Sequence, residues 1–220
     1  MKRIALLHTV PSVFLSFEER IRTALPGEEL SIHNTLDEFL AADANIRGFT
    51  QNNRNRLFYL LKAIELEEPD LIAVTCSTLT PEVARMRPFL SVPLIAIDDA
   101  MAKKAVTLGS KITVMATAQS TVKPTCQKLL EDAAAIGKKL ALSHMVCHEA
   151  YEAIKRMDQL THDAVLRKAA ETIHDQDVVV LAQASMAHME PELNAICRVP
   201  VLSSPALCVE QIVHTLFPKR

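Results

Sequence analysis

A single cysteine surrounded by hydroxyl side chains stands out in the stretch Asp70–Pro81, DLIAVTCSTLTP. Cys76 follows a short apolar run, Leu71–Val74, that is typical of a buried parallel strand. Pro81 and Glu82 then favour the first turn of a helix. Open α/β sheets bind ligands at such strand ends, and a helix N-terminus favours an anion and lowers the pKa of a thiol. We therefore expect Cys76 to lie in a site for a small anion, with a lowered pKa.

The same pattern occurs twice in the chain. The stretch that begins at Asp177, DVVVLAQASMAHMEPELNAICRVPVLSS, aligns without a gap with DLIAVTCSTLTPEVARMRPFLSVPLIAI, which begins at Asp70. A repeat of this length sets the architecture, and it indicates two similar α/β halves. The alignment places Cys76 opposite Gln183, so the thiol of the first half has no counterpart in the second.

Alternating strand and helix patterns predict a parallel sheet in each half. We expect strands at Ile4–Leu7, Leu30–His33, Leu71–Val74, Leu94–Ile97, Lys111–Ala116, Leu140–Val146, from Asp177, and at Val201–Ser203. We expect helices from a Ser16/Glu19 capping box to Leu25, over Asn53–Glu67, from Pro81, from Asp98-Asp99 to Leu108, over Thr121–Ala135, over His162–His174 with Thr161 as cap, and over Pro205–Phe217. Residues 41–52 are expected to form a loop or lid.

The predicted fold class is therefore α/β, with two pseudo-symmetric Rossmann-like halves, parallel sheets and an active-site cleft between the halves. The first half is expected to comprise residues 1–98 with the C-terminal helix 204–220. The second half is expected to comprise residues 99–203. In this arrangement the two equivalent strand ends can face each other across the cleft.

Composition excludes several classes of function. A net charge of −2 gives no basic surface for nucleic acid or an anionic membrane. No apolar run reaches the roughly 20 residues of a membrane-spanning helix. The four glycines form neither a GxGxxG nor a P-loop pattern, which argues against nucleotide chemistry. The five cysteines form no CxxC pair, which indicates a reducing, cytoplasmic setting.

Outside the repeat position, the cysteines are expected to pack as small apolar groups; they are Cys126, Cys147, Cys197 and Cys208. The run Cys147-His148-Glu149 contains possible metal ligands, but adjacent residues of an extended segment point to opposite sides. We therefore expect no metal site.

Four blocks in the same order resemble the cofactor-independent aspartate/glutamate racemase superfamily, which includes hydantoin racemases, maleate isomerase and arylmalonate decarboxylase. The blocks are CST at residues 76–78, VPLIAIDDAMAKKAV, SKITVMATAQSTVKP and DVVVLAQAS. Racemases usually show CNT at the first block and a second cysteine, in LGCT, at the last. Here that second position is Gln183, which cannot act as a base. The resemblance covers nearly the whole chain and implies an enzyme that uses no cofactor.

The resemblance also implies where a substrate binds. Family members hold a small carboxylate between the two halves, and a cysteine gives or takes a proton at the acidic carbon. Cys76 matches that acid/base, and His8, at the end of the first strand where glutamate racemases have Asp-Ser, can assist it. The implied substrate-binding residues are Thr9, Ser77, Thr78, Thr117, Thr121, Gln183, Ala184 and Ser185. The hydroxyl groups among these residues have an alternative role as helix caps. The alternative role of His8 is a hydrogen bond that is purely structural.

The leading hypothesis is an isomerase-type enzyme that transfers a proton from a single thiol to the carbon next to a carboxylate or carbonyl. Alternatives are a decarboxylase or lyase, a nucleophilic Cys76, a racemase with His8 as its second base, and a non-catalytic carboxylate-binding or regulatory protein. A catalytic thiol should alkylate at a rate that reaches a plateau below about pH 8. The expected partners are a small carboxylate and further copies of the chain, as a dimer or larger homo-oligomer, with no nucleic acid and no membrane.

Overall fold

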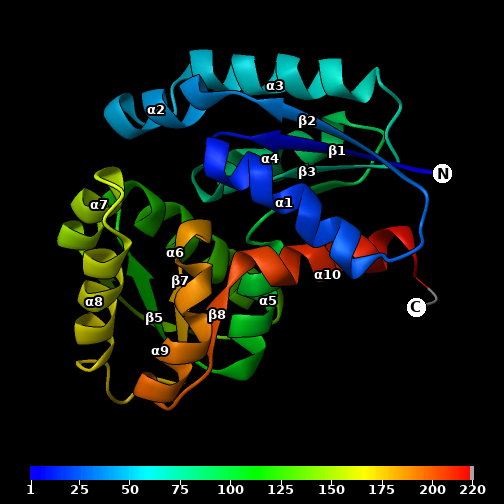
Figure 1. The fold of residues 1–220 in the computed structure, drawn as a ribbon. Coiled ribbons are helices and arrows are strands. Elements are labelled where there is room, and N and C mark those ends of the chain that lie inside the picture. The colour runs from blue at the N-terminus through cyan, green and yellow to red at the C-terminus, as the bar shows by residue number, and fades with distance from the viewer. Residues whose placement is uncertain (219–220) are drawn as a thin grey trace. The chain divides into compact units, whose positions relative to one another are not determined.

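The computed structural model describes residues 1–218, and of Ser12 it describes the backbone alone. The chain forms two compact units: unit 1 comprises Met1–Asp99 and Pro205–Arg220, and unit 2 comprises Ala100–Ser204. The unit boundaries expected from the sequence, after residues 98 and 203, each lie one residue before the observed boundaries. Each unit contains a four-stranded parallel sheet with helices, which confirms the predicted α/β class (Figure 1).

Unit 1 has the strand order β2-β1-β3-β4. Its strands are β1 (Lys2–His8), β2 (Leu30–Leu36), β3 (Leu71–Val74) and β4 (Leu94–Ala96). Its helices are α1 (Pro11–Ala24), α2 (Glu38–Arg47), α3 (Gln51–Glu65), α4 (Thr80–Met86) and α10 (Ser204–Leu216), with the 3-10 turns η1 (Ser77–Leu79) and η2 (Arg87–Phe89). Every residue of β3 is buried, as its uninterrupted apolar sequence requires.

The two faces of the unit 1 sheet are covered by different helices. Leu57 and Leu61 of α3 share one hydrophobic cluster with Ala5 and Leu7 of β1. Because successive strand residues point to opposite faces, the other β1 residues face the side on which α1 lies (Figure 1). The α3 prediction rested on this apolar spacing, and the helix is confirmed.

Unit 2 repeats the topology, with the order β6-β5-β7-β8. Its strands are β5 (Lys111–Ala116), β6 (Ala141–Val146), β7 (Val178–Leu181) and β8 (Val201–Ser203). Its helices are α5 (Asp99–Leu108), α6 (Gln119–Ala135), α7 (His148–Lys155), α8 (Gln159–Ala170) and α9 (Glu190–Cys197), with the 3-10 segment η3 (Ala184–Met189). The equivalent strand order in the two sheets is what the sequence repeat predicts.

Asp70 and Asp177 occupy equivalent positions in the repeat, and each accepts hydrogen bonds from the backbone at the start of a neighbouring strand. Asp70 accepts a hydrogen bond from the Arg3 backbone N–H at 2.8 Å, which ties the start of β3 to the start of β1. Asp177 accepts from the backbone N–H groups of Ser110 and Lys111, at 2.7 and 2.9 Å, beside β5. A side chain at Gly109 would place its Cβ 2.1 Å from the Asp177 Cβ, so the close approach requires glycine.

Two expectations about unit 1 helices are wrong. Helix α1 begins at Pro11, whose fixed φ suits a first turn, and the Ser16 hydroxyl bonds to the Val13 carbonyl instead of capping a helix. The segment 41–52 is not a loop, because α2 and α3 occupy most of it. Asp37 and Thr50 cap these two helices with their side chains. A short turn around Gly48, at φ 70°, separates them.

Two expectations about unit 2 helices are also wrong. Helix α8 begins at Gln159 and ends at Ala170, and its cap is Asp158, which accepts from the Thr161 backbone N–H at 3.0 Å. Cys147 is not in an extended segment but precedes the first turn of α7, a helix that the sequence did not predict.

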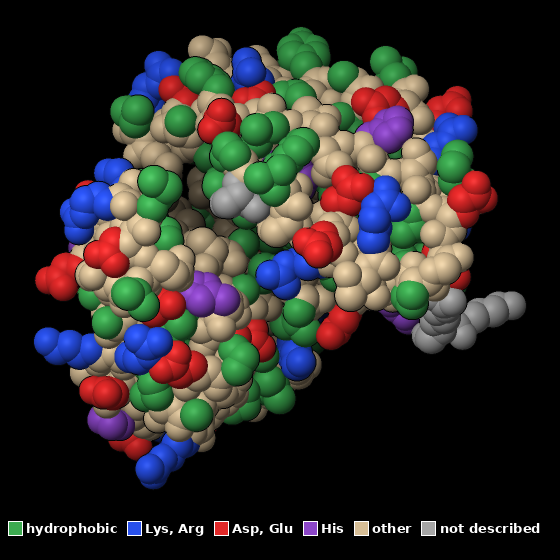
Figure 2. All heavy atoms as spheres, viewed as in Figure 1, with side chains coloured by type: hydrophobic (Ala, Val, Ile, Leu, Met, Phe, Trp, Pro, Cys, Tyr) green, Lys and Arg blue, Asp and Glu red, His purple; other side chains and the backbone are tan. Residues whose placement is uncertain are grey.

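Within the described residues, no helix is long and apolar enough to cross a membrane. Acidic and basic side chains are interspersed on the face shown in Figure 2.

Candidate active site

Polar side chains gather where β1 and β3 end side by side in unit 1. Parallel pairing aligns Leu7 with Val74, and the Thr75 backbone N–H donates to the Leu7 carbonyl at 2.9 Å. The residues that follow the two strands are therefore neighbours at the carboxyl edge of the sheet. His8 and Thr9 come from β1 and its end, and Cys76 comes from the end of β3.

The Cys76 thiol is buried, with 9% of the residue exposed. Burial raises the pKa of Cys76 above its ordinary value, and the nearby Asp98 carboxylate acts in the same direction. The Thr9 hydroxyl and the backbone N–H groups of Leu79 and Thr78 oppose this shift without reversing it. The predicted lowered pKa is therefore wrong: the helix N-terminal donors are present, but loss of hydration outweighs them.

This pKa direction predicts the reactivity of the thiol. Alkylation of Cys76 by iodoacetamide, followed by peptide mass spectrometry, is expected to accelerate with pH beyond the ordinary thiol value of 9.0. The reason is that the reactive thiolate forms only above the raised pKa. A rate that reaches a plateau below pH 8, as the sequence suggested, would contradict the raised pKa. Cys126, which is half-buried, provides an internal comparison in the same digest.

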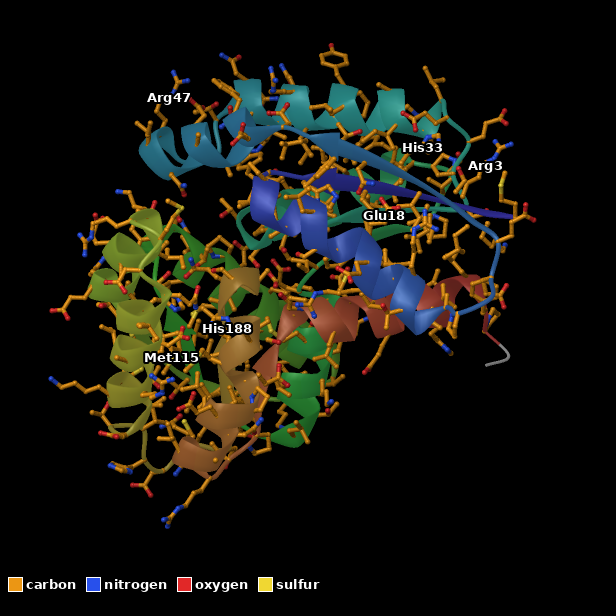
Figure 3. All side chains as sticks on the ribbon, viewed as in Figure 1. Arg3, Glu18, His33, Arg47, Met115 and His188 are labelled. Carbon is orange, nitrogen blue, oxygen red and sulfur yellow. The ribbon has the colours of Figure 1, made fainter. Side chains whose placement is uncertain are left out.

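His8 is fully buried, and both of its ring nitrogens have partners. Nε2 lies 3.0 Å from the Asn34 side-chain oxygen and Nδ1 lies 2.8 Å from the Thr75 hydroxyl. Because the Asn34 amide donates to Glu18 at 2.6 Å, its oxygen faces His8, so Nε2 is the donor. In the neutral ring Nδ1 then accepts from the Thr75 hydroxyl, which also lies 3.4 Å from the Leu7 carbonyl. Glu18, on α1, is labelled in Figure 3. The chain of hydrogen bonds fixes the orientation of the His8 ring and of the hydroxyl that precedes Cys76, whereas burial favours the neutral ring.

The charge state of His8 is open to a direct test. Burial lowers the pKa of His8, and the Asn34 hydrogen bond only partly offsets it. The His8 ring is therefore expected to stay neutral as pH falls through 6.5, where an ordinary histidine titrates. Asn34→Asp would place a carboxylate on Nε2 and raise that pKa.

The measurement is the pH dependence of the His8 Cε1–H NMR signal. A His8 signal that shifts in the unmodified chain as pH falls through 6.5 would contradict the expected neutral ring.

A buried carboxylate lies under the cysteine turn. Asp98 accepts from the Ser77 hydroxyl at 3.0 Å and from the Thr80 hydroxyl at 3.1 Å. Ser77 is buried at the start of η1 and Thr78 beside it is half-buried. Ser77 therefore has a structural partner, whereas the Thr78 side chain lies at a more accessible position.

The equivalent edge of unit 2 is organised around Gln183. Its side-chain oxygen accepts from the Thr117 backbone N–H at 2.6 Å, the Ala118 backbone N–H at 3.0 Å and the Thr117 hydroxyl at 3.0 Å. In the repeat, Thr117 corresponds to Thr9 and Gln183 to Cys76. The same pair of positions therefore meets in both units, with a thiol in one and an amide oxygen in the other.

The other predicted residues of unit 2 lie around this edge. The buried Thr121 bonds through its hydroxyl to the Ala118 carbonyl at 2.9 Å, within the first turn of α6. Ala184 is half-buried at the start of η3, and Ser185 after it is exposed. Each unit thus brings its own predicted residues together at one sheet edge.

Four residues of this network were not assigned to the site from sequence: Glu18, Asn34, Thr75 and Asp98. Thr75 is adjacent to Cys76 and could have been included on that ground. Asn34 is recognisable only once β2 is paired with β1, where it lies opposite Leu6, two residues before His8 and on the same face of the sheet. Asp98 was predicted only as a helix cap, and its contact with the cysteine turn depends on the β3–β4 pairing.

Comparison with known proteins gives the family. The sequence profile described as Asp/Glu/Hydantoin racemase matches residues 13–212. The chain belongs to the Asp/Glu/hydantoin racemase family. This confirms the resemblance inferred from the four sequence blocks. Among curated proteins, no sequence matches the chain.

Solved structures share the fold at low sequence identity. A glutamate racemase from Bacillus anthracis is 17% identical, with a TM-score of 0.77 over 99% of this chain and 82% of that one. An allantoin racemase from Klebsiella pneumoniae is 18% identical, with a TM-score of 0.64 over 98% and 88%. An arylmalonate decarboxylase is 14% identical, with a TM-score of 0.63 over 99% and 94%. These likenesses establish the fold, on which racemases and a decarboxylase both occur.

Proposed function

We propose that the protein is a cofactor-independent enzyme that protonates the carbon next to a carboxylate or carbonyl of a small acid, with Cys76 as the proton donor. The observation that supports this most is the state of the thiol. It is buried beside the Thr9 hydroxyl and two backbone N–H groups, and its raised pKa keeps it protonated at neutral pH. A protonated thiol beside hydrogen-bond donors suits delivery of a proton to a carbon whose negative charge is spread onto substrate oxygens.

The proposed step moves one proton. The Sγ–H bond breaks, a C–H bond forms at the substrate carbon, and water reprotonates the thiolate. The carbon receives its electron pair either from the C=C bond of an enol, whose O–H proton passes to water, or from a C–C bond that breaks as carbon dioxide leaves. A 2-substituted malonate or an enol form of a keto acid is therefore the favoured substrate class.

Racemisation by two thiols is not proposed for this chain. Gln183 occupies the second position, and an amide can neither remove nor supply the proton. Its oxygen is also held by three internal donors. Protonation from one side, which gives a single product configuration, is the chemistry that one thiol supports.

In this scheme His8 is a positioning residue that acts through Thr75. Both of its nitrogens are bonded within unit 1, so a role as the second base would require breaking that network. Thr78, Thr121 and Ser185 are proposed to contact substrate oxygens, together with the donors around Thr9 and Ser77, whereas Thr117 already donates to the Gln183 oxygen.

The test is proton NMR in D2O with a panel of 2-substituted malonates, keto and hydroxy acids, hydantoins and amino acids. The expected result is loss of carbon dioxide or of an enol signal, with one deuterium at the new C–H carbon in a single configuration. Deuterium in both enantiomers would overturn one-sided chemistry in favour of a racemase. Turnover that persists unchanged in Cys76→Ala would overturn the thiol mechanism. A carboxylate that binds to the chain without turnover would support the non-catalytic alternative.

A further inference from the structure

Three side chains of unit 2 converge at a place that the proposed reaction does not use. His162 and Asp163 lie on α8, and His188 lies on η3, where it is labelled in Figure 3. The Asp163 Oδ1 atom is 2.7 Å from His162 Nδ1 and 2.8 Å from His188 Nε2. One ligand atom from each residue lies within 4.8 Å of the other two. The two imidazole rings stack with their centroids 5.8 Å apart.

The three side chains present their ligand atoms to one another. His188 Nδ1 donates to the Ser185 carbonyl at 3.0 Å, so its Nε2 faces the cluster. The Gln159 amide nitrogen lies 2.8 Å from both His188 Nε2 and Asp163 Oδ1. His162 Nδ1, Asp163 Oδ1 and His188 Nε2 therefore lie close enough to share one metal ion in place of the protons that bridge them.

Burial adds a second observation. His162 is fully buried and its Nε2 has no hydrogen-bond partner among the described residues, so the ring is not explained as a satisfied core histidine. Asp163 beside it is also largely buried, with only 14% of its side chain exposed.

We propose that His162, Asp163 and His188 bind one transition-metal dication of the zinc type. Two imidazoles and one carboxylate, with a fourth position open to water, form an established zinc donor set. Metal–ligand distances of about 2.0–2.2 Å in tetrahedral geometry require the Asp163 oxygen to separate from each histidine nitrogen by about half an ångström or slightly more. The bond from His188 to the Ser185 carbonyl is the outer contact that commonly orients a metal-binding imidazole. The sequence prediction of no metal site considered only residues 147–149, which are not involved.

The ion would join two segments that are distant in the sequence. His188 belongs to the turn that follows Gln183 and Ser185, whereas His162 and Asp163 belong to α8. Binding would therefore fix η3 against α8 in unit 2. This site does not depend on the chemistry of Cys76, which belongs to unit 1.

The test is zinc binding by the full chain after chelator treatment and dialysis, with ZnCl2 titrated against a chromophoric chelator. His188→Gln is the first variant, because 43% of the His188 side chain is exposed and the fold should tolerate the change. His144→Gln, at an exposed histidine of β6, is the matched control. The expected result is one zinc ion per chain, unchanged affinity in the control, and at least about 100-fold weaker binding in His188→Gln.

A second readout uses CoCl2, whose visible absorption bands should be intense with the unmodified chain and absent with His188→Gln. If circular dichroism shows that His188→Gln does not fold, Asp163→Asn, which removes the charge with little change in shape, should give the same loss. Zinc binding that is absent, or equal in His188→Gln and the unmodified chain, would overturn the proposal. Cys76→Ala should keep the ion, so this result and the test of the proposed function are independent.

Discussion

Cys76→Ala is expected to lower turnover of the best substrate by about 10²–10⁴-fold, the usual contribution of a positioned general acid or base. The loss should appear in kcat, because the thiol acts on the substrate only as the proton moves. Cys76→Ser should be almost as poor, because a hydroxyl in the same buried position gives up its proton far less readily. The measurement is steady-state kinetics on the substrate identified by NMR.

The matched control is Cys147→Ala. Cys147 is also buried, follows strand β6 in unit 2, and has a pKa raised by burial. It therefore shares the environment of Cys76 without the Thr9 hydroxyl and the donors of η1. Its replacement should leave kcat within about twofold, since substitutions away from the reacting atoms have small effects on a chemical step. Equal losses in the two variants would mean that both act through stability.

The pH profile separates the donor role from a thiolate base. Because the raised pKa keeps Cys76 protonated, a donor mechanism predicts a constant rate through neutral pH and a fall only above the ordinary value of 9.0. A thiolate base or nucleophile predicts the opposite slope, a rate that rises toward that pH. A rising profile would therefore keep Cys76 in the site but replace its proposed role.

The sequence predicted well where Cys76 lies in the fold, because strand ends are encoded locally. The apolar run Leu71–Val74 and Pro81 at the following helix placed Cys76 at a sheet edge. The repeat then placed Gln183 at the equivalent edge of the second half. The position of Cys76 follows from short-range patterns, and the position of Gln183 follows from the internal repeat. Both can be identified in a single sequence.

The chemistry of the site was less predictable because it depends on long-range packing. The direction of the Cys76 pKa is set by how completely the folded unit removes the thiol from water. The pairing of His8 with Asn34 requires the register of β1 against β2. The contact of Asp98 with Ser77 crosses from the end of β4 to η1. None of these distances follows from the spacing of residues along the chain.

Gln183→Ala is expected to lower the free energy of unfolding by about 2 kcal/mol, because it leaves donors of Thr117 and Ala118 without their acceptor at a largely buried position. Gln183→Glu should retain the stability at neutral pH, since a carboxylate oxygen can accept the same three hydrogen bonds. Urea denaturation of the two variants measures both values. Gln127→Ala, which removes an exposed amide bonded to Glu131, is the control and should change stability by less than about 0.5 kcal/mol.

The same variant tests why unit 2 differs from unit 1. Two backbone N–H groups and a hydroxyl that converge on one oxygen are the donors that a substrate carboxylate would use. In the unmodified chain the Gln183 oxygen already occupies them, so a carboxylate cannot bind there without displacing it. Acetate should therefore raise the melting temperature of Gln183→Ala by more than it raises that of the unmodified chain, because a ligand stabilises only the state that binds it.

Equal stabilisation of both proteins by the carboxylate would contradict this explanation. It would mean that carboxylates bind elsewhere and that the Gln183 contacts are purely structural. Stabilisation of the variant alone would mean that the second half of the chain carries its own acceptor in place of a second thiol. In that case the loss of the second cysteine is not a simple deletion, because the replacing residue also fills the donor set beside it.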